Sequence, residues 1–302
     1  MDKMKLSIII LSWNTGELLK QCLESVISGL FIKELTDYKC RVEIIVVDNA
    51  SEDGSCEMVK KEFPEVRLIQ NKENLGFAKG NNVGLNEAKG EYIMILNSDT
   101  IIKEGAIEKL VKFLDTNENA AGVMPLLLNK DNSIQKDPIY LRFPSPLFVF
   151  INYNSFFKKI AVNFFSDLLY SVNDFSRVSE VEQLSGAAMI IKGDILKSIG
   201  GFDETYPYYF EDVDLSFQLR KLGYKLFMDP EAKIIHLGGQ STKKLIENDG
   251  MDKMHYLNFN SLFIFSDKSY SKTKSKMIKF IVLAQLILKG KLKLVRKLLS
   301  KN

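Results

Sequence analysis

The chain has 302 residues, of which 46% are hydrophobic and 26% are charged. These values are typical of a folded globular protein and exclude a disordered, collagen-like or coiled-coil chain. Because α/β folds often extend over about 200–250 residues as one unit, this length predicts one large domain with an appendage. The three cysteines, Cys22, Cys40 and Cys56, form no CxxC pair. Their spacing argues against a disulfide framework or a zinc cluster and favours a reducing compartment.

Charge is distributed unevenly along the chain. The net charge is +3, yet residues 268–302 contain eleven Lys or Arg and no Asp or Glu. The preceding residues are therefore acidic overall, which argues against broad nucleic-acid binding. A basic segment of this kind usually faces an anionic partner, and an anionic membrane surface is the better candidate here. The alternative is a solvated basic helix that covers the acidic body.

The apolar runs are too short for integral membrane attachment. The longest, Met277–Leu288, has ten apolar residues in twelve, whereas a membrane-spanning helix needs about 20. The N-terminal run from Leu6 to Leu11 is too short for the apolar region of a signal peptide.

The first 130 residues alternate short β-branched runs with helical patterns. Strands covered on both faces are predicted at 7–11, 43–47, 66–69 and 92–96. After the first strand, apolar residues recur at helical spacing from Leu18 to Ile27, and Thr15 can supply the N-cap. This rhythm predicts consecutive βαβ units and a doubly wound, mostly parallel sheet that binds ligands at the carboxyl ends of its strands.

Aromatic residues gather in the middle of the chain. Residues 140–175 contain eleven Phe or Tyr, and the whole chain has 32 aromatic residues. We interpret this region as an aromatic-rich helical insertion, at about 140–180, that packs on the sheet. The alternative is an apolar wall for a lipid-linked ligand. The α/β rhythm returns at 184–237, and one or two basic amphipathic helices are predicted after residue 268.

The usual phosphate-binding fingerprints are absent. No segment matches GxxxxGK[ST], and Gly76, Gly80 and Gly84 are four residues apart rather than spaced as GxGxxG. The same segment, residues 71–84, has four Asn and three Gly at the start of a predicted helix. Asn offers a donor and an acceptor, and Gly lets a ligand approach the backbone. The alternative is that Asn favours the helix start and Gly84 permits tight packing.

Two acidic residues follow predicted strands. Asp48 precedes a run of turn-forming residues, so its carboxylate can bind a nucleobase imide or a ribose hydroxyl, or can form a local turn or helix cap. Asn97-Ser98-Asp99 follows the strand at 92–96. One carboxylate and an amide carbonyl can hold a divalent cation together with diphosphate oxygens and water. A simple turn before the next helix is the alternative.

A histidine and an acidic cluster complete the candidates. His236, one of only two histidines, ends a predicted strand and can ligate manganese through its imidazole, or can be a buried structural residue. Glu211-Asp212-Val213-Asp214 begins a predicted helix after an aromatic run. Acids in a first turn stabilise a helix, but three exceed what capping requires. A partly desolvated carboxylate makes a good general base because burial raises its pKa.

In this order the segments resemble the family-2 glycosyltransferases with the GT-A fold, and among these the bacterial rhamnosyltransferase-like enzymes of cell-surface polysaccharide assembly. The resemblance covers about residues 5–240 and is strongest in 184–226 and 74–84. It implies a GT-A domain over 1–267, which includes the aromatic-rich insertion. A basic amphipathic helical tail over 268–302 follows.

The resemblance also implies roles for individual residues. The positions that match those holding the donor nucleotide are Ser12, Trp13, Asp48, Asn74, Gly76, Gly80, Asn81, Asn97 and Ser98. Asp99 matches the last acid of the DxD motif and would bind the metal and the diphosphate, with Asn97 in place of the first acid. His236 matches a metal ligand of some relatives. Asp212 matches the catalytic base, and Glu211 would orient the acceptor.

The implied reaction is inverting transfer of a sugar from a pyrimidine nucleotide donor, with dTDP-rhamnose ahead of UDP-hexoses. The acceptor is a hydroxyl of a cell-surface polysaccharide or lipid-linked glycan, and the cofactor is Mn²⁺ or Mg²⁺. The enzyme is expected in the cytoplasm, attached through its tail to the inner face of the plasma membrane. No nucleic-acid partner is expected, and the chain can form a homodimer or act alone.

Two alternatives to sugar transfer stay open. A nucleotidyltransferase would require a glycine-rich, basic phosphate-binding loop near the N-terminus, and residues 11–19 contain no such loop. A catalytically silent scaffold at the membrane is kept open by Asn97.

Overall fold

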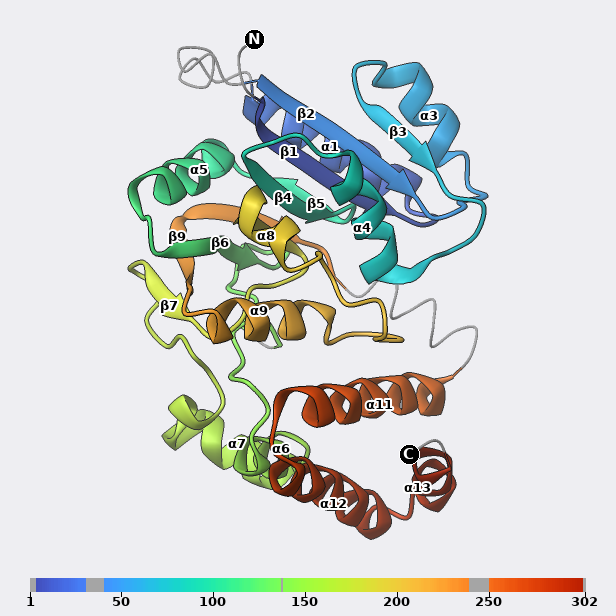
Figure 1. Ribbon diagram of the computed structural model, residues 1–302, viewed down its shortest axis with the longest axis vertical. Coiled ribbons are helices and arrows are strands. Elements are labelled where there is room, and N and C mark those ends of the chain that lie inside the picture. Colours follow the sequence, from blue (N-terminus) through green and yellow to red (C-terminus); the bar gives the residue numbers. More distant parts are fainter. Residues whose placement is uncertain (1–3, 31–40, 137, 239–249, 301–302) are drawn as a thin grey trace.

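The computed structural model describes residues 4–30, 41–136, 138–238 and 250–300 (Figure 1). Within these residues the strands form one sheet in the order β3-β2-β1-β4-β8-β6-β9-β5, and β7 also pairs with β9. The strands are β1 (Met4–Ser12), β2 (Arg41–Asp48), β3 (Arg67–Gln70), β4 (Tyr92–Asn97), β5 (Thr100–Ile102), β6 (Ala120–Leu128), β7 (Ser179–Val181), β8 (Ala188–Lys192) and β9 (Lys225–His236).

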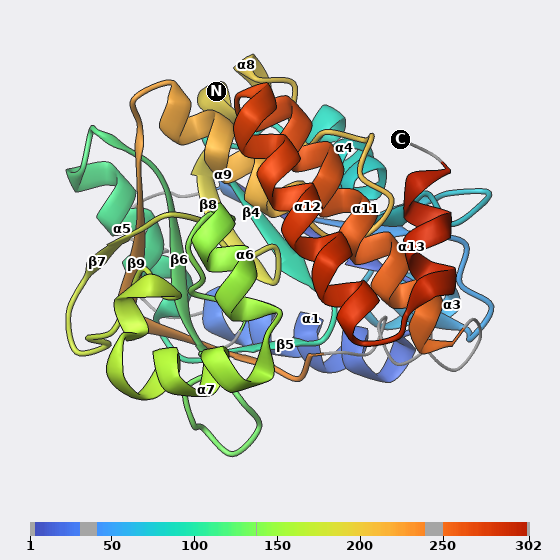
Figure 2. The same ribbon diagram turned by 90° about the horizontal axis from the view of Figure 1, so that it is seen from below.

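Helices flank this sheet and also form a separate layer near one of its edges. Those beside the sheet are α1 (Gly16–Leu30), α3 (Ser55–Glu62), α4 (Gly76–Glu87), α5 (Ala106–Thr116), α8 (Gly193–Ser198) and α9 (Glu211–Lys221). Those in the separate layer are α6 (Pro146–Asn152), α7 (Ser155–Phe164), the short 3₁₀ helix η1 (Ser166–Leu168), α11 (Met251–Ser269), α12 (Lys272–Leu288) and α13 (Leu292–Leu299) (Figure 2).

The mixed α/β class predicted from the sequence is confirmed, but only half of the sheet is parallel. Strands β3, β2, β1 and β4 pair in parallel, as do β6 and β9. Strand β8 runs antiparallel to both β4 and β6. Strand β8 runs back along β6, with Ile190 opposite Val123 and Ile191 opposite Gly122.

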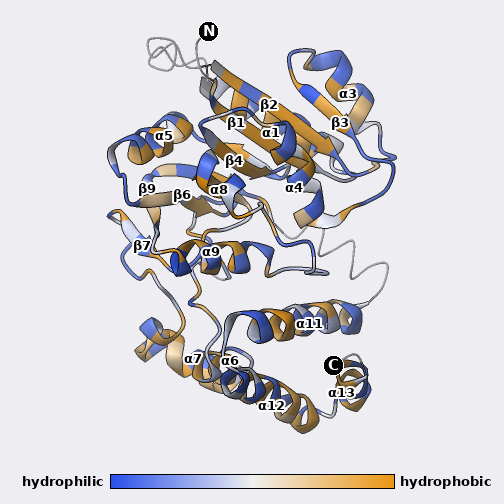
Figure 3. Ribbon diagram, viewed as in Figure 1, coloured by the Kyte–Doolittle hydropathy of each residue, from blue (hydrophilic) through white to orange (hydrophobic). Residues whose placement is uncertain are grey.

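Burial of the strands follows their continuous apolar runs. Ile8, Ile9 and Ile10 of β1 are all completely buried, although neighbouring side chains point to opposite faces of a strand. The same holds for Ile93–Leu96 of β4. Figure 3 shows these strands as hydrophobic along their length. Both faces of the sheet are therefore covered, as expected for parallel strands between helices.

The C-terminal helices pack onto the aromatic insertion. Helix α12 lies against both α11 and α6, and its buried residues include Ile278, Val282 and Leu286. The expected domain boundary at residue 267 falls inside α11, which ends at Ser269. Residues after 268 therefore share a helical layer with residues 146–168. Among the described residues, every helix is too short or too polar to cross a lipid bilayer.

Two cysteines are described, and both are structural. Cys22 and Cys56 are buried free thiols, while Cys40 lies outside the described residues.

Helix α4 approaches the sheet closely through two glycines. A Cβ atom at Gly80 would lie 2.5 Å from Cδ1 of Leu11, and one at Gly84 would lie 2.5 Å from Cγ2 of Ile9. Neither space holds a methyl group without displacement of the strand side chains. The tight packing considered for Gly84 on sequence grounds is therefore present, and it fixes the start of α4 against the ends of β1 and β2.

We expect Gly84→Ala to lower the free energy of unfolding by about 1–3 kcal/mol, because overpacking of a filled core is destabilising. The measurement is urea unfolding followed by circular dichroism. Gly29→Ala in α1 is the matched control, since its Cβ would lie 3.6 Å from Ile102 in ordinary contact. That variant should be unchanged or stabilised by up to about 1 kcal/mol. Equal effects of the two substitutions would contradict the close approach of α4.

Candidate active site

A cavity of about 1460 Å³ lies where the carboxyl ends of β1 and β4 face helices α6 and α11. Ser12 and Asn97 line it from the sheet, and Phe148 and Leu257 line it from the two helices. This position is the point where the strand order reverses between β1 and β4, which is the usual ligand site of such sheets. Pockets for one small ligand usually measure about 300–1,000 Å³, so this cavity is larger than one such ligand requires.

Most of the sequence-predicted site residues meet at this cavity. They come from segments that are up to 224 positions apart in the chain, and those that line the cavity are Ser12, Trp13, Asn74, Gly76, Asn97, Ser98, Asp99, Glu211, Asp212 and His236.

Three predicted residues are buried and are not among those that line the cavity. Asp48 is 1% exposed, and its Oδ1 accepts a hydrogen bond of 2.8 Å from the amide of Ser51, which is the local turn considered above. Gly80 faces Leu11, as described. Asn81 donates from Nδ2 to the carbonyl of Phe77 within α4 at 3.0 Å. In this structure these residues support the wall, and their predicted contact with a nucleotide stays a prediction.

A chain of hydroxyl groups joins the ends of β1 and β4. Ser12 Oγ lies 3.0 Å from Thr15 Oγ1, which in turn lies 2.8 Å from Ser98 Oγ. Thr15 also lines the cavity, although the sequence suggested only a capping role for it. Hydroxyl groups both donate and accept, so this chain can adapt to the polar atoms of a ligand.

Asparagine side chains hold the loop before α4. Asn49 Nδ2 donates to Asn74 Oδ1 at 3.2 Å and to the carbonyl of Gly76 at 3.1 Å. Asn71 Nδ2 donates to Asn49 Oδ1 at 2.9 Å. Asn49 is 2% exposed and lines the cavity in place of its neighbour Asp48. The Asn-rich segment is therefore a preformed polar wall.

Antiparallel pairing of β5 with β9 brings Asp99 and His236 together. Thr100 lies opposite His236 in this pairing, and the amide of Leu237 donates to the carbonyl of Asp99 at 2.9 Å. As a result, Asp99 Oδ1 lies 3.4 Å from His236 Nε2. Both side chains are nearly buried and line the cavity.

Gln135 sets the orientation of the His236 ring. Its Nε2 donates to the carbonyl of His236 at 3.4 Å, so its Oε1 is the atom that lies 2.8 Å from His236 Nδ1. Nδ1 can therefore donate to Oε1 of Gln135, while Nε2 faces Oδ1 of Asp99.

The side chains of Asp99 and His236 fit part of a site for a divalent cation, and a bound ligand would supply the rest of that site. Among the residues that the structure describes, no cluster of three or more His, Cys, Asp or Glu could hold a metal ion alone. Asp99 and His236 could supply two ligands, and diphosphate oxygens and water are ligands that such a hard cation also takes.

Asp212 is held by backbone amides at the start of α9. Its Oδ2 accepts from Gly186 at 2.8 Å and its Oδ1 accepts from Val213 at 2.9 Å. Burial raises the pKa of Asp212, and these amides oppose that shift. Burial, followed by the neighbouring Asp212 carboxylate, raises the pKa of Glu211 to about 8. Two adjacent acids thus line one cavity, and burial raises the pKa of both.

Asp214, the third acid of this turn, has a structural role. It is 3% exposed and accepts a hydrogen bond of 3.0 Å from the hydroxyl of Tyr206. It does not belong to the residues that line the cavity.

The aromatic loop before α9 has a strained backbone that α11 supports. Tyr209 and Phe210 have φ of 61° and 74°, which is the left-handed region that large side chains avoid. Such strain persists only where surrounding contacts hold it. Ser261 Oγ donates to the carbonyl of Tyr208 at 2.8 Å, and the ring of Phe265 lies 5.7 Å from that of Phe210.

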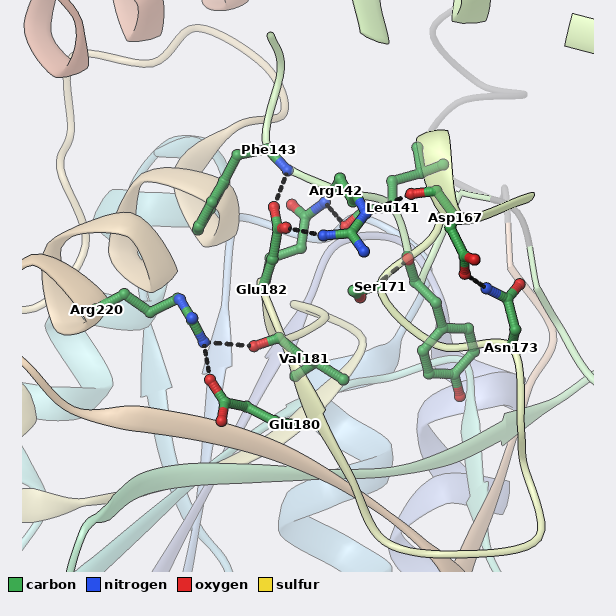
Figure 4. A network of polar contacts seen from close by, with 12 residues as sticks. Leu141, Arg142, Phe143, Asp167, Ser171, Asn173, Glu180, Val181, Glu182 and Arg220 are labelled. Atoms are coloured by element: carbon green, nitrogen blue, oxygen red, sulfur yellow. Dashed lines mark hydrogen bonds and ion pairs between the residues drawn. The ribbon is translucent and has the colours of Figure 1, made fainter. Parts of the chain in front are cut away.

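Polar contacts fasten the aromatic insertion to the segment before β8 (Figure 4). Arg142 Nη1 and the amide of Phe143 each donate to the carboxylate of Glu182 at 2.6 Å. Gln183 Nε2 donates to the carbonyl of Leu141 at 2.6 Å. Leu141 and Arg142 line the cavity, so this network positions the wall that faces the sheet.

Sequence reasoning missed four residues that shape the site: Thr15, Asn49, Gln135 and Gly186. Asn49 follows the predicted Asp48, and Thr15 follows the predicted Ser12 and Trp13, so proximity to a strand end was an available signal. Gln135 had no such signal, because its contact with His236 spans 101 positions.

Comparisons with known proteins agree with this architecture. A mannosyltransferase from Pyrobaculum calidifontis, solved with GDP-mannose and Mn²⁺, superposes with a TM-score of 0.59 at 16% identity, over 100% of this chain and 75% of that one. This likeness confirms the GT-A fold.

Sequence comparisons point the same way. The N-acetylglucosaminyl-diphospho-decaprenol L-rhamnosyltransferase of Mycobacterium tuberculosis is 25% identical over 222 residues, which cover 67% of this chain and 68% of that protein. The low-salt glycan biosynthesis hexosyltransferase Agl10 of Haloferax volcanii is 24% identical over 93% of this chain and 81% of its own length.

The fold and the sequence relatives thus agree on one class of enzyme, the glycosyltransferases. The model of glycosyl transferase family 2 matches residues 7–178, which is more than half of the chain. The chain belongs to this family, and it is a glycosyltransferase.

The raised pKa of Glu211 makes stability depend on pH. The carboxyl group is protonated in both the folded and unfolded states well below its ordinary pKa of 4.5, and is ionised in both above about 8. Between these values folding must keep a proton that the unfolded chain has lost, so stability falls as the pH rises. We expect Glu211→Gln to reduce this fall by about 4 kcal/mol between pH 5 and pH 9.

The measurement is the free energy of unfolding in urea at the two pH values. Glu57→Gln, at an exposed position of α3, is the control and should leave the pH dependence unchanged. An identical pH dependence in wild type and Glu211→Gln would show that Glu211 is not held in a desolvated site.

Proposed function

We propose that this enzyme transfers a hexose, with inversion at the anomeric carbon, from a pyrimidine nucleotide donor to a hydroxyl group of a glycan. The observation that carries the proposal is the cavity shared by Asp99, Asp212 and His236 at the strand-order reversal. The donor nucleotide would occupy the side formed by Ser12, Thr15 and the Asn-rich loop. The acceptor would enter from the side formed by α6 and α11.

Asp212 would act as the general base. Its carboxylate faces the cavity, and the amides of Gly186 and Val213 fix the direction of its oxygens. It would take the proton of the acceptor hydroxyl while the acceptor oxygen bonds to the anomeric carbon and the bond from that carbon to the diphosphate breaks. Because one displacement suffices, no covalent enzyme intermediate is needed. Glu211 would orient the acceptor.

Asp99 and His236 would hold the divalent cation, either Mn²⁺ or Mg²⁺. When bound, the cation would neutralise the charge that develops on the leaving nucleoside diphosphate. Gln135 keeps His236 in the tautomer that leaves Nε2 available for a metal.

The choice of donor and acceptor follows the relatives. The Mycobacterium relative is named as an L-rhamnosyltransferase that acts on a diphospho-decaprenol carrier. We infer dTDP-rhamnose as the first donor to test and a lipid-linked or polysaccharide glycan as the acceptor. A lipid-linked acceptor would place the enzyme at the inner face of the plasma membrane, with the basic residues after 268 facing anionic lipid.

The nucleotidyltransferase alternative differs in its product. A glycosyltransferase releases nucleoside diphosphate from the donor, whereas a nucleotidyltransferase releases pyrophosphate.

We expect Asp212→Asn to lower kcat by about 10²–10⁴-fold while donor binding is retained, because the amide cannot accept the acceptor proton. The measurement is release of nucleoside diphosphate from dTDP- and UDP-sugars in the presence of an acceptor. Asp214→Asn is the matched control, because Asp214 lies outside the cavity lining and its remaining oxygen can still accept from Tyr206. Full activity of Asp212→Asn would remove this residue from the role of base.

Donor binding should depend on the cation and on Asp99. In a thermal-shift panel of dTDP- and UDP-sugars, the matching donor should raise the Tm of the wild type more with Mn²⁺ than without it, because ligands that bind only the folded state stabilise it. Asp99→Ala should lose the manganese-dependent part of this shift. Asp115→Ala, far from the cavity, should retain it. A manganese-dependent shift that survives in Asp99→Ala would place the cation elsewhere.

A further inference from the structure

The helices that lie farthest from the sheet carry an exposed apolar surface. Fifteen of the twenty large hydrophobic residues that are exposed in the described part of the chain lie in residues 146–168 and 272–299. These residues form α6, α7 and η1 together with α12 and α13, which lie side by side in the view from below (Figure 2). We call the outward surface of these helices the basal face. Exposed apolar patches of this extent mark binding surfaces.

Helix α7 contributes most to the basal face. Ala161 is its one buried residue. Phe156 is 67% exposed and Phe164 is 76% exposed, and Phe165 directly after the helix is 58% exposed. Packing within the chain therefore does not explain why this helix is rich in phenylalanine, and Figure 3 shows it as largely hydrophobic.

Helix α12 is apolar on two opposite sides. Its inner side packs against α11 and α6 through buried residues such as Ile278 and Val282. Its outer side presents Phe280 at 72% and Leu288 at 86% exposure. A helix at the surface of a protein in water usually has a polar outer side. The outer side of α12 therefore suits an apolar medium.

The charge of the same helices indicates which apolar medium contacts the basal face. Residues 146–168 and 272–299 contain eleven Lys or Arg and a single acid, Asp167. Phenylalanine and leucine surrounded by lysine are the composition of helices that lie in the interface of an anionic bilayer. A second copy of the chain would bring two basal faces of the same charge together, which electrostatic repulsion disfavours.

We propose that the basal face docks on an anionic lipid bilayer, with the aromatic residues of α7 and the outer side of α12 inserted at the headgroup level. The docking surface is built from two distant parts of the chain, so it is neither the insertion nor the C-terminal segment alone. Deletion of the residues after 268 would uncover the buried side of α11, and point substitutions are the appropriate test.

Helix α6 connects this surface with the cavity. Phe148 and Asn152 line the cavity, while Leu147 and Phe150 of the same helix are exposed on the basal face. An acceptor anchored in the bilayer would therefore reach the catalytic groups past α6 while its lipid stays in the membrane. This part of the inference rests on the proposed transfer to a lipid-linked glycan.

The test is co-sedimentation of the full chain with vesicles of phosphatidylglycerol and phosphatidylcholine, without donor or acceptor. We expect binding to mixed anionic vesicles at low salt and at least tenfold weaker binding to pure phosphatidylcholine. Phe156→Ser combined with Phe164→Ser should weaken binding at least tenfold. Val178→Ser combined with Leu222→Ser is the matched control, because these residues are 44% and 59% exposed outside the basal face, and it should bind like the wild type.

A charge variant tests the electrostatic part separately. Lys272→Gln combined with Lys276→Gln should weaken binding to anionic vesicles several-fold and reduce its salt dependence, whereas the exposed pair Lys60→Gln and Lys61→Gln on α3 should not. The proposal is overturned if the wild type binds neither vesicle, or if sedimentation shows a dimer that the Phe substitutions dissociate.

The proposed reaction is tested independently of docking. Vesicle binding without turnover of any nucleotide sugar would reject the proposed function and leave the docking surface in place. Release of nucleoside diphosphate with a soluble acceptor, but no vesicle binding, would do the reverse.

Discussion

The arrangement of the site depends on the antiparallel pairing of β5 with β9. Asp99 precedes β5 and His236 ends β9, so the pairing of Thr100 with His236 sets the two side chains 3.4 Å apart. Strand β9 also runs parallel to β6 in the interior of the sheet, and this fixes its position. A shift of the β5 pairing by one residue would therefore change the residue that lies opposite His236 and would displace Asp99 from the imidazole. The close approach of Asp99 to His236 thus depends on the register of β5, a strand of only three residues.

The ends of the strands could be predicted from the sequence because neighbouring residues determine where each strand ends. Continuous apolar runs followed by Ser12, Asp48 or Asn97 mark strands that are buried on both faces and that end at a polar edge. Parallel strands place such ends on one side of a sheet. The same argument does not say which side chain at an edge faces the ligand, and here Asn49 lines the cavity while Asp48 is turned inward.

Other parts of the site could not be predicted because they depend on contacts between distant segments. The antiparallel direction of β8 depends on the path of the chain between β6 and β8, and no periodicity encodes that path. Gln135 contacts His236 from a loop of this region, and Gly186 donates to Asp212 from the start of β8. Glycine at 186 has a steric reason, since a Cβ there would lie 2.9 Å from the ring of Phe77. Such requirements appear only when the segments are brought together.

The helical layer explains why the two acids of the cavity, Glu211 and Asp212, and the C-terminal helices belong to one unit. The strained turn at Tyr209 and Phe210 directs Glu211 and Asp212 into the cavity, and each residue in the left-handed region costs of order 1 kcal/mol or more. Helix α11 offsets this cost through Ser261 and Phe265, and α12 packs on α11 from the other side. The helix that supports the strained turn is therefore also held by a helix of the basal face. One packed layer consequently lines the cavity, supports the turn before the proposed base through α11, and presents the apolar surface.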